Sequence, residues 1–186
     1  MISVLASGPD AEPVTLAELR AHLHIDTQND LLLNSLISSA RLFIEAETGV
    51  RMLSQRWRLL LNEWPHKIIE LPVWPIIEVL HVKLLGSPSK LVNDTAYELE
   101  SAARPAVLMV DDAALPTPLR DRYGIELEVL AGFGTSSDNL PEDLKLSVML
   151  LAAYWFDLDD WSPYRTAPTV PPHVQDMINR HRLARI

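Results

Sequence analysis

Three groups of polar residues have types and spacing that could support chemistry. His22 and His24 are two positions apart on a predicted helix, so they cannot chelate a metal from one face as an i, i+4 pair does. The carboxylates of Asp157, Asp159 and Asp160 suit a hard cation such as calcium or magnesium. That run lacks the glycine and the closing glutamate of an EF-hand loop, so a solvated helix end is the favoured interpretation.

The third candidate is Gly132-Phe133-Gly134, which lies between a predicted strand and a predicted helix, where a phosphate-binding loop would lie. The third glycine is missing and no Gly-Lys-Ser/Thr follows. No serine occupies a Gly-x-Ser-x-Gly elbow, and the chain has no cysteine. We therefore expect no catalytic residue, no cofactor and no metal site. A small metal-dependent enzyme with an acidic site around Asp157–Asp160 is the minor alternative.

Composition and charge narrow the function further. The 186 residues are 48% hydrophobic, which is enough for a core, and the net charge is −9, from 16 basic and 25 acidic residues. A protein that grips DNA phosphates normally has the opposite balance, although a weakly repulsive wall suits DNA that slides past. The absence of cysteine fits a reducing compartment. We expect no signal peptide and no membrane span, because neither pattern is present.

Helical signals occur at both ends of the chain and predict a helical core. Thr15 and Glu18 form a capping box for a short helix that should end near His24. A second helix should begin near Thr27 or Asn29 and end at Gly49, which completes an N-terminal helical pair over residues 13–50. A third helix, apolar over most of its circumference, is expected over residues 140–158, with Pro141 near its first position.

Between these helices, residues 53–131 have the period of β-strands. Alternating residues after Ser54 and again from Ile125 to Leu130 predict strands with one buried face. Pro72 and Pro75 should interrupt the pairing. The expected result is an antiparallel β meander inserted into the helical core. Trp64 and Trp74, each followed by a proline, are candidates for an exposed contact surface, since tryptophans are enriched at interfaces.

The C-terminal segment combines a proline-rich linker over residues 162–172 with an amphipathic helix over residues 173–186. The apolar positions have i, i+3, i+4, i+7 spacing, and arginines surround them. Such a helix docks either on its own body or on a partner, and the pattern does not distinguish the two. The predicted docking residues are Val174, Met177, Ile178, Arg180, His181, Arg182 and Arg185. The overall expectation is one α+β domain over residues 1–186.

The ordered landmarks resemble the head–tail connector, or adaptor, proteins of long-tailed bacteriophages and gene transfer agents. The resemblance lies in Val14-Thr15-Leu16-Ala17-Glu18-Leu19, Ala40-Arg41-Leu42-Phe43-Ile44-Glu45, Gln55-Arg56-Trp57-Arg58-Leu59, Ala131-Gly132-Phe133-Gly134 and Leu140-Pro141-Glu142-Asp143-Leu144-Lys145. Each piece is unspecific alone, but together they span nearly the whole chain in the expected order.

The resemblance implies a non-enzymatic virion protein at the head–tail junction, assembled in the bacterial host cytoplasm. It implies a homo-oligomeric ring of about twelve copies, whose neighbours make heterologous contacts that close by rotation. The implied partners are the portal protein and a tail-completion or stopper protein, with DNA passing the lumen without specific binding. The C-terminal segment, Val170–Ile186 here, would reach the portal. Another neck or tail subunit of the tail-terminator type is the alternative.

Overall fold

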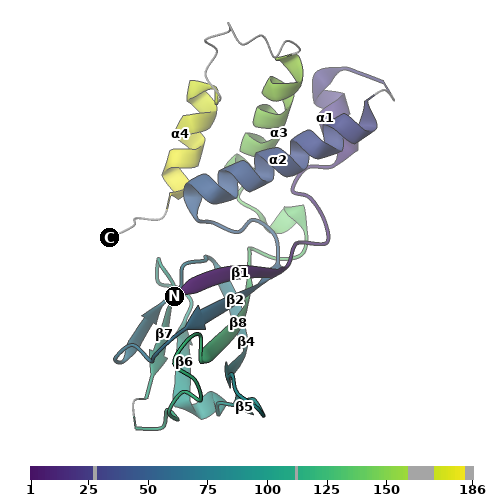
Figure 1. Ribbon diagram of the computed structural model, residues 1–186. Coiled ribbons are helices and arrows are strands. Elements are labelled where there is room, and N and C mark those ends of the chain that lie inside the picture. Colours follow the sequence, from purple (N-terminus) through teal and green to yellow (C-terminus); the bar gives the residue numbers. More distant parts are fainter. Residues whose placement is uncertain (27–28, 112, 159–169, 183–186) are drawn as a thin grey trace, which may run out of the picture. The chain divides into compact units, whose positions relative to one another are not determined.

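The chain folds into two compact units, a helical unit and a β unit (Figure 1). The β unit contains residues 1–9 and 54–133, and the helical unit contains residues 10–53 and 134–182. The β unit thus includes residues 1–9 in addition to the β region predicted over residues 53–131. The α+β class is confirmed. The computed structural model describes residues 1–26, 29–111, 113–158 and 170–182.

The first helix of the helical unit, α1 (Leu16–Leu23), begins where the sequence predicts. The backbone N–H of Glu18 donates to Thr15 Oγ1 at 3.2 Å, and the Thr15 N–H donates to the Glu18 carboxylate at 2.7 Å. Lys145 also donates to Glu18, at 2.8 Å, and joins α3 to α1. This hydrogen bond is the main reason that the pKa of Glu18 is lowered to about 2. The helix ends at His24, as expected.

The long helix α2 (Asp30–Thr48) buries one stripe of apolar side chains and ends at Gly49. Gly49 has a φ of 78°, which glycine adopts without steric cost, and its N–H donates to Glu45 O at 3.0 Å. Glu45 is only 2% exposed, and its carboxylate accepts from Met52 N at 2.9 Å and from Arg41 at 3.3 Å. These bonds compensate the charge of a buried carboxylate.

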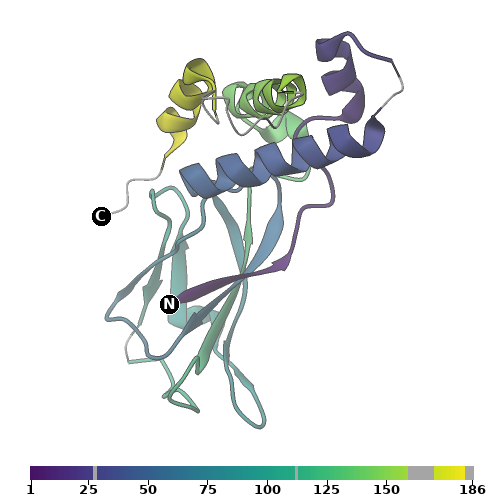
Figure 2. The same ribbon diagram turned by 45° about the horizontal axis from the view of Figure 1, so that its top comes forward.

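The remaining helices, α3 (Glu142–Asp157) and α4 (Pro172–His181), pack with α2 and with each other, and α1 contacts α2 and α3 (Figure 2). Pro141 was expected near the first helical position of α3, and it is instead the N-cap residue, one position earlier. No helix in the described ranges combines the length and the apolarity that crossing a bilayer requires. The apolar side chains of α2 and α3 that are at most 1% exposed are Leu33, Ile37, Ala40, Ile44, Leu144, Val148, Leu151 and Ala152.

The β unit contains two antiparallel sheets. The larger has the strand order β1-β2-β8-β4-β5 and the smaller has the order β3-β7-β6. This order corrects the predicted meander, because β8 pairs between two strands that precede it by many residues. The strands are β1 (Ile2–Ser7), β2 (Gln55–Leu61), β3 (Ile68–Glu70), β4 (Ile76–Leu84), β5 (Lys90–Leu91), β6 (Tyr97–Glu100), β7 (Val107–Val110) and β8 (Ile125–Ala131). Short 3-10 turns are Asp94–Ala96 and Ser137–Asn139.

Alternate residues of the central strand β8 face opposite sides of the larger sheet, one apolar and the other polar. Ile125, Leu127 and Val129 are 0% exposed and form the core face with their neighbours on β2 and β4. Glu126 and Glu128 project from the opposite face, because successive strand residues alternate. The alternation predicted for this strand is therefore confirmed.

Candidate functional site

The C-terminal helix α4 docks on the chain's own helical unit. Val174 and Ile178 are 0% exposed, and the helix contacts α2 and α3. His181 Nε2 lies 2.7 Å from a carboxylate oxygen of Asp143 on α3. Arg182 forms an ion pair with Glu47 on α2. The sequence pattern left open whether the apolar stripe of this helix docks on its own chain or on a partner. In this structure it docks on the chain's own helical unit.

The structure divides the predicted docking residues into an inner and an outer set. Val174 and Ile178 belong to the inner set, because they lie in the core of the helical unit. Arg180 is exposed and Met177 is half-buried, so both are accessible on the outer side of α4. Arg185 and most of the predicted linker lie outside the described residues.

The two tryptophans that were expected on an exposed surface make contacts within the β unit. Trp74 is 6% exposed and packs edge-to-face on Phe133, with ring centroids 5.6 Å apart. The Arg104 guanidinium lies 3.9 Å from the Trp74 ring centroid. Trp64 is half-buried, and its Nε1 donates to Pro116 O at 2.8 Å. The exposure prediction is wrong for Trp74, because Phe133 and Arg104 enclose the ring.

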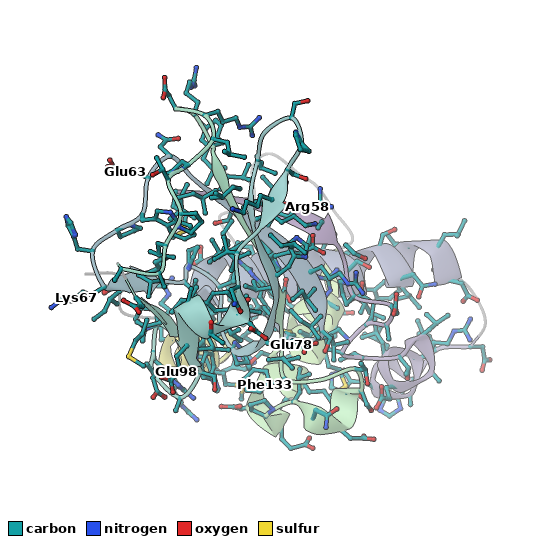
Figure 3. The ribbon with its side chains drawn as sticks, turned by 90° about the horizontal axis from the view of Figure 1, so that it is seen from below. Arg58, Glu63, Lys67, Glu78, Glu98 and Phe133 are labelled. Carbon is teal, nitrogen blue, oxygen red and sulfur yellow. The ribbon has the colours of Figure 1, made fainter. Side chains whose placement is uncertain are left out.

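The Gly132–Gly134 loop makes structural contacts within the β unit. The Gly132 N–H donates to Pro75 O at 2.9 Å, and Phe133, labelled in Figure 3, contacts Trp74. The boundary between the two compact units follows Phe133. The loop therefore anchors the end of β8 within the β unit.

The described members of the other two candidate groups lie at helix ends. His22 and His24 are exposed at the end of α1. Asp157 is exposed at the end of α3, whereas Asp159 and Asp160 lie outside the described residues.

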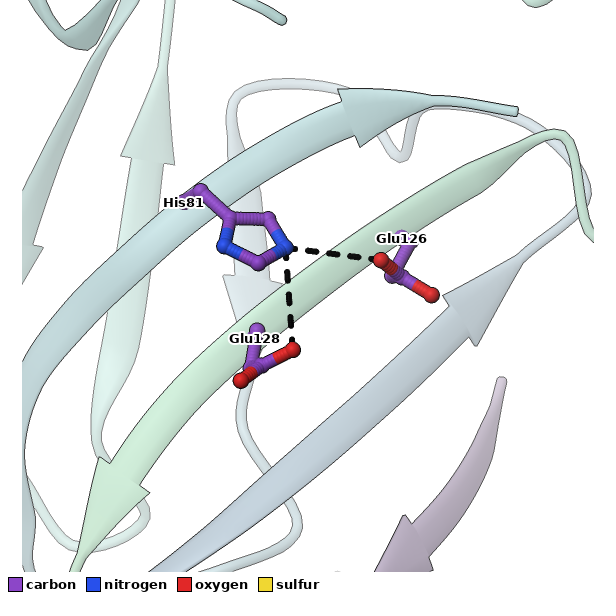
Figure 4. Close-up of side chains that lie close together, drawn as sticks. All are labelled: His81, Glu126 and Glu128. Atoms are coloured by element: carbon purple, nitrogen blue, oxygen red, sulfur yellow. Dashed lines mark hydrogen bonds and ion pairs between the residues drawn. The ribbon is translucent and has the colours of Figure 1, made fainter. Parts of the chain in front are cut away.

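A cluster on the polar face of the larger sheet was not anticipated. His81 on β4 points one ring nitrogen at two carboxylates of β8 (Figure 4). Its Nε2 lies 3.4 Å from Glu126 Oε1 and 3.7 Å from Glu128 Oε2. The three donor atoms lie within 4.8 Å of one another. Among the described residues, this is the one group of three histidine or acidic side chains close enough to share an ion.

Strand register builds this cluster. Glu128 on β8 stands opposite Arg58 on β2 and opposite His81 on β4. Arg58 Nε donates to Glu128 Oε2 at 3.1 Å, and the more distant Arg56 lies 3.9 Å from Oε1. The side chains of His81, Glu126 and Glu128 are 21%, 13% and 10% exposed, so the cluster is largely withdrawn from water. The alternation of β8 predicts that its two glutamates share a face, but the position of His81 depends on pairing that the sequence does not display.

Comparison with solved structures finds similarity over the whole chain. A chain from the neck of an empty gene transfer agent particle, computed with C6 symmetry, is 26% identical with a TM-score of 0.82. A chain from the neck of a native particle, computed with C12 symmetry, is 28% identical with a TM-score of 0.81. A chain from the virion of a native particle is 26% identical, also with a TM-score of 0.81. Each match covers 100% of this chain and 97% of the other.

No protein-family model and no curated protein sequence matches the chain.

Proposed function

We propose that this chain is a structural subunit of the neck of a gene transfer agent or related phage particle. The observation that carries the proposal is the full-length similarity to chains of such particles, two of them from the neck. The match includes both compact units, because it covers the entire chain. Catalysis has no part in this proposal, since the similar chains come from particle necks and virions.

The finer proposal is an adaptor that forms a closed ring of about twelve copies. In a closed ring each subunit uses both of its different contact faces, so no contact face is left unpaired. The C6 and C12 symmetries of the similar neck structures support this stoichiometry. The ring joins the portal to a tail-completion protein at the head–tail junction, after assembly in the host cytoplasm. Its net charge of −9 favours a lumen past which DNA phosphates slide without specific binding.

The contact with the portal is proposed for the outer side of α4 and the residues that follow it. Val174 and Ile178 hold α4 on the helical unit, so they position the contact without being part of it. Arg180 and Met177 remain accessible and offer a cation and a flexible apolar side chain. We therefore do not propose that the whole apolar stripe of α4 inserts into the portal, because Val174 and Ile178 are buried in the helical unit.

The test is mass measurement of the purified chain, alone and mixed with its cognate portal. We expect a complex of about twelve chains per portal ring for the wild type, in agreement with a closed ring. Arg180→Glu should weaken that complex, because it reverses the charge at the proposed contact. Lys90→Glu is the matched control, since it makes the same reversal at an exposed position of the β unit.

The outcomes separate the levels of the proposal. Absence of a wild-type complex with the portal would refute the adaptor role. A wild-type complex that Arg180→Glu leaves intact would refute the contact through α4 while retaining the adaptor role. Equal weakening by Arg180→Glu and Lys90→Glu would also refute a specific contact at α4.

A further inference from the structure

We propose that His81, Glu126 and Glu128 form a binding site for one divalent transition-metal ion, with Zn²⁺ as the best fit. The inference is independent of the proposed function, because it concerns the polar face of the larger sheet by itself. The site would join β4 to β8 and leave at least one coordination position for water or another ligand, as three-ligand zinc sites do.

The distances in the cluster favour a metal over direct hydrogen bonds. A good N–H···O bond has a donor–acceptor distance of about 2.7–3.2 Å. The separations of 3.4 and 3.7 Å from His81 Nε2 are longer than that, and one imidazole N–H cannot serve both carboxylates fully. Zinc ligands lie about 2.0–2.2 Å from the metal, so donor atoms in a tetrahedral site are roughly 3.3–3.6 Å apart. The two separations from His81 Nε2 are close to that spacing, and the two carboxylate oxygens lie within 4.8 Å of each other.

The charges around the cluster leave room for a cation. Arg58 compensates Glu128, and its hydrogen bond can orient that carboxylate in the way that outer groups orient metal ligands. Glu126 has no such partner: of the described residues, only His81 pairs with it. Lys83 stands opposite Glu126 in the strand register without forming an ion pair with it. Two adjacent carboxylates, one of them without a cationic partner, favour a bound cation over a neutral occupant.

The donor set indicates which ion. One imidazole nitrogen and two carboxylate oxygens suit Zn²⁺, and the same ligand types bind Mn²⁺ and Co²⁺. Mg²⁺ prefers a shell of oxygen ligands that is rich in water, so an imidazole at this site should select against it.

The experiment is a titration of the full-length, metal-free protein with Zn²⁺, followed by calorimetry, and with Co²⁺, followed by its visible absorption. We expect one tight Zn²⁺ per chain, a four-coordinate cobalt spectrum and no comparable heat with Mg²⁺. His81→Ala and Glu126→Gln should each lower the affinity by at least about tenfold, because each removes a ligand. Saturating Zn²⁺ should also raise the thermal midpoint of the wild type, since the ion binds the folded state.

Two control variants test specificity. Glu78→Gln removes a carboxylate from the same strand and face but outside the cluster, and His66→Ala removes another histidine of the β unit. Both should bind Zn²⁺ as the wild type does, and circular dichroism of the metal-free variants establishes that each is folded. The proposal is overturned if the wild type binds Zn²⁺ no better than His81→Ala. It is also overturned if either control loses as much affinity as the cluster variants.

Discussion

Replacing Ile178 by alanine should release α4 from the helical unit without unfolding the rest of that unit. An isolated helix of ten residues has little stability in water, so α4 depends on its docked apolar stripe. Val174 and Ile178 are the two side chains of that stripe that are fully buried, and burial of each contributes about 1.5–3 kcal/mol. Ile178→Ala should therefore cost about 2–4 kcal/mol, mostly as local opening of α4.

Hydrogen exchange measured by residue provides the assay. A loss of about 2–4 kcal/mol corresponds to a fall of roughly 30- to 700-fold in the protection of the α4 amides. The amides of α2 should keep most of their protection, because its stripe against α1 and α3 is unchanged. Asp176→Ala is the matched control, since Asp176 is exposed on the same helix and should change stability by less than about 0.5 kcal/mol. Unchanged α4 protection in Ile178→Ala, or equal loss in α2 and α4, would refute the reasoning.

Substitutions at three further positions test other contacts. Lys145 is the main reason that the pKa of Glu18 is lowered to about 2, so the contribution of the Glu18 carboxylate to folding stability is complete above its ordinary pKa of 4.5 and is lost as pH falls towards 2. Glu18→Gln should therefore reduce the fall of the thermal midpoint over this pH range. An unaltered acid profile would contradict this. Trp74→Ala should cost about 3–5 kcal/mol in urea unfolding. Trp74→Phe should cost clearly less, because Trp74 Nε1 has no hydrogen-bond partner among the described residues, and equal costs would contradict this. Gly134→Ala should cost at least about 1 kcal/mol in the same assay, because its φ is 151° and a Cβ would collide with the Asn139 side chain; a neutral result would show that the loop relaxes.

Local backbone chemistry made the start of α1 and the end of α2 predictable from sequence. The Thr15 and Glu18 capping box and the glycine at position 49 satisfy groups within a few residues of themselves. The amphipathic pattern likewise predicted the existence of α4, because its spacing is a property of consecutive residues. The helix ends at His181, whereas the sequence had suggested an end at residue 186. The pattern could not identify what covers Val174 and Ile178, since that depends on α2 and α3.

Features that depend on strand pairing were beyond the sequence. All six residues of β1 are exposed, so this strand has no buried stripe to reveal it, and it depends on pairing with β2. In β4, strict alternation would place Val79 and His81 on one face. The irregularity between them leaves Val79 opposite Val129 on the core face and turns His81 to Glu128 on the polar face. One extra residue in the ladder thus creates the cluster.

The central place of β8 also determines the order in which the chain can fold as it is synthesised. β2 and β4 flank β8, yet both leave the ribosome before residues 125–131 are made. Until then their inner edges present unpaired backbone groups to water, and such edges favour aggregation. The helical unit also cannot be completed before β8 is made, because α2 packs on α3 and α4, which follow β8 in the sequence. Neither unit can be completed first from the N-terminus, so a nascent or truncated chain that stops before residue 125 leaves both unfinished.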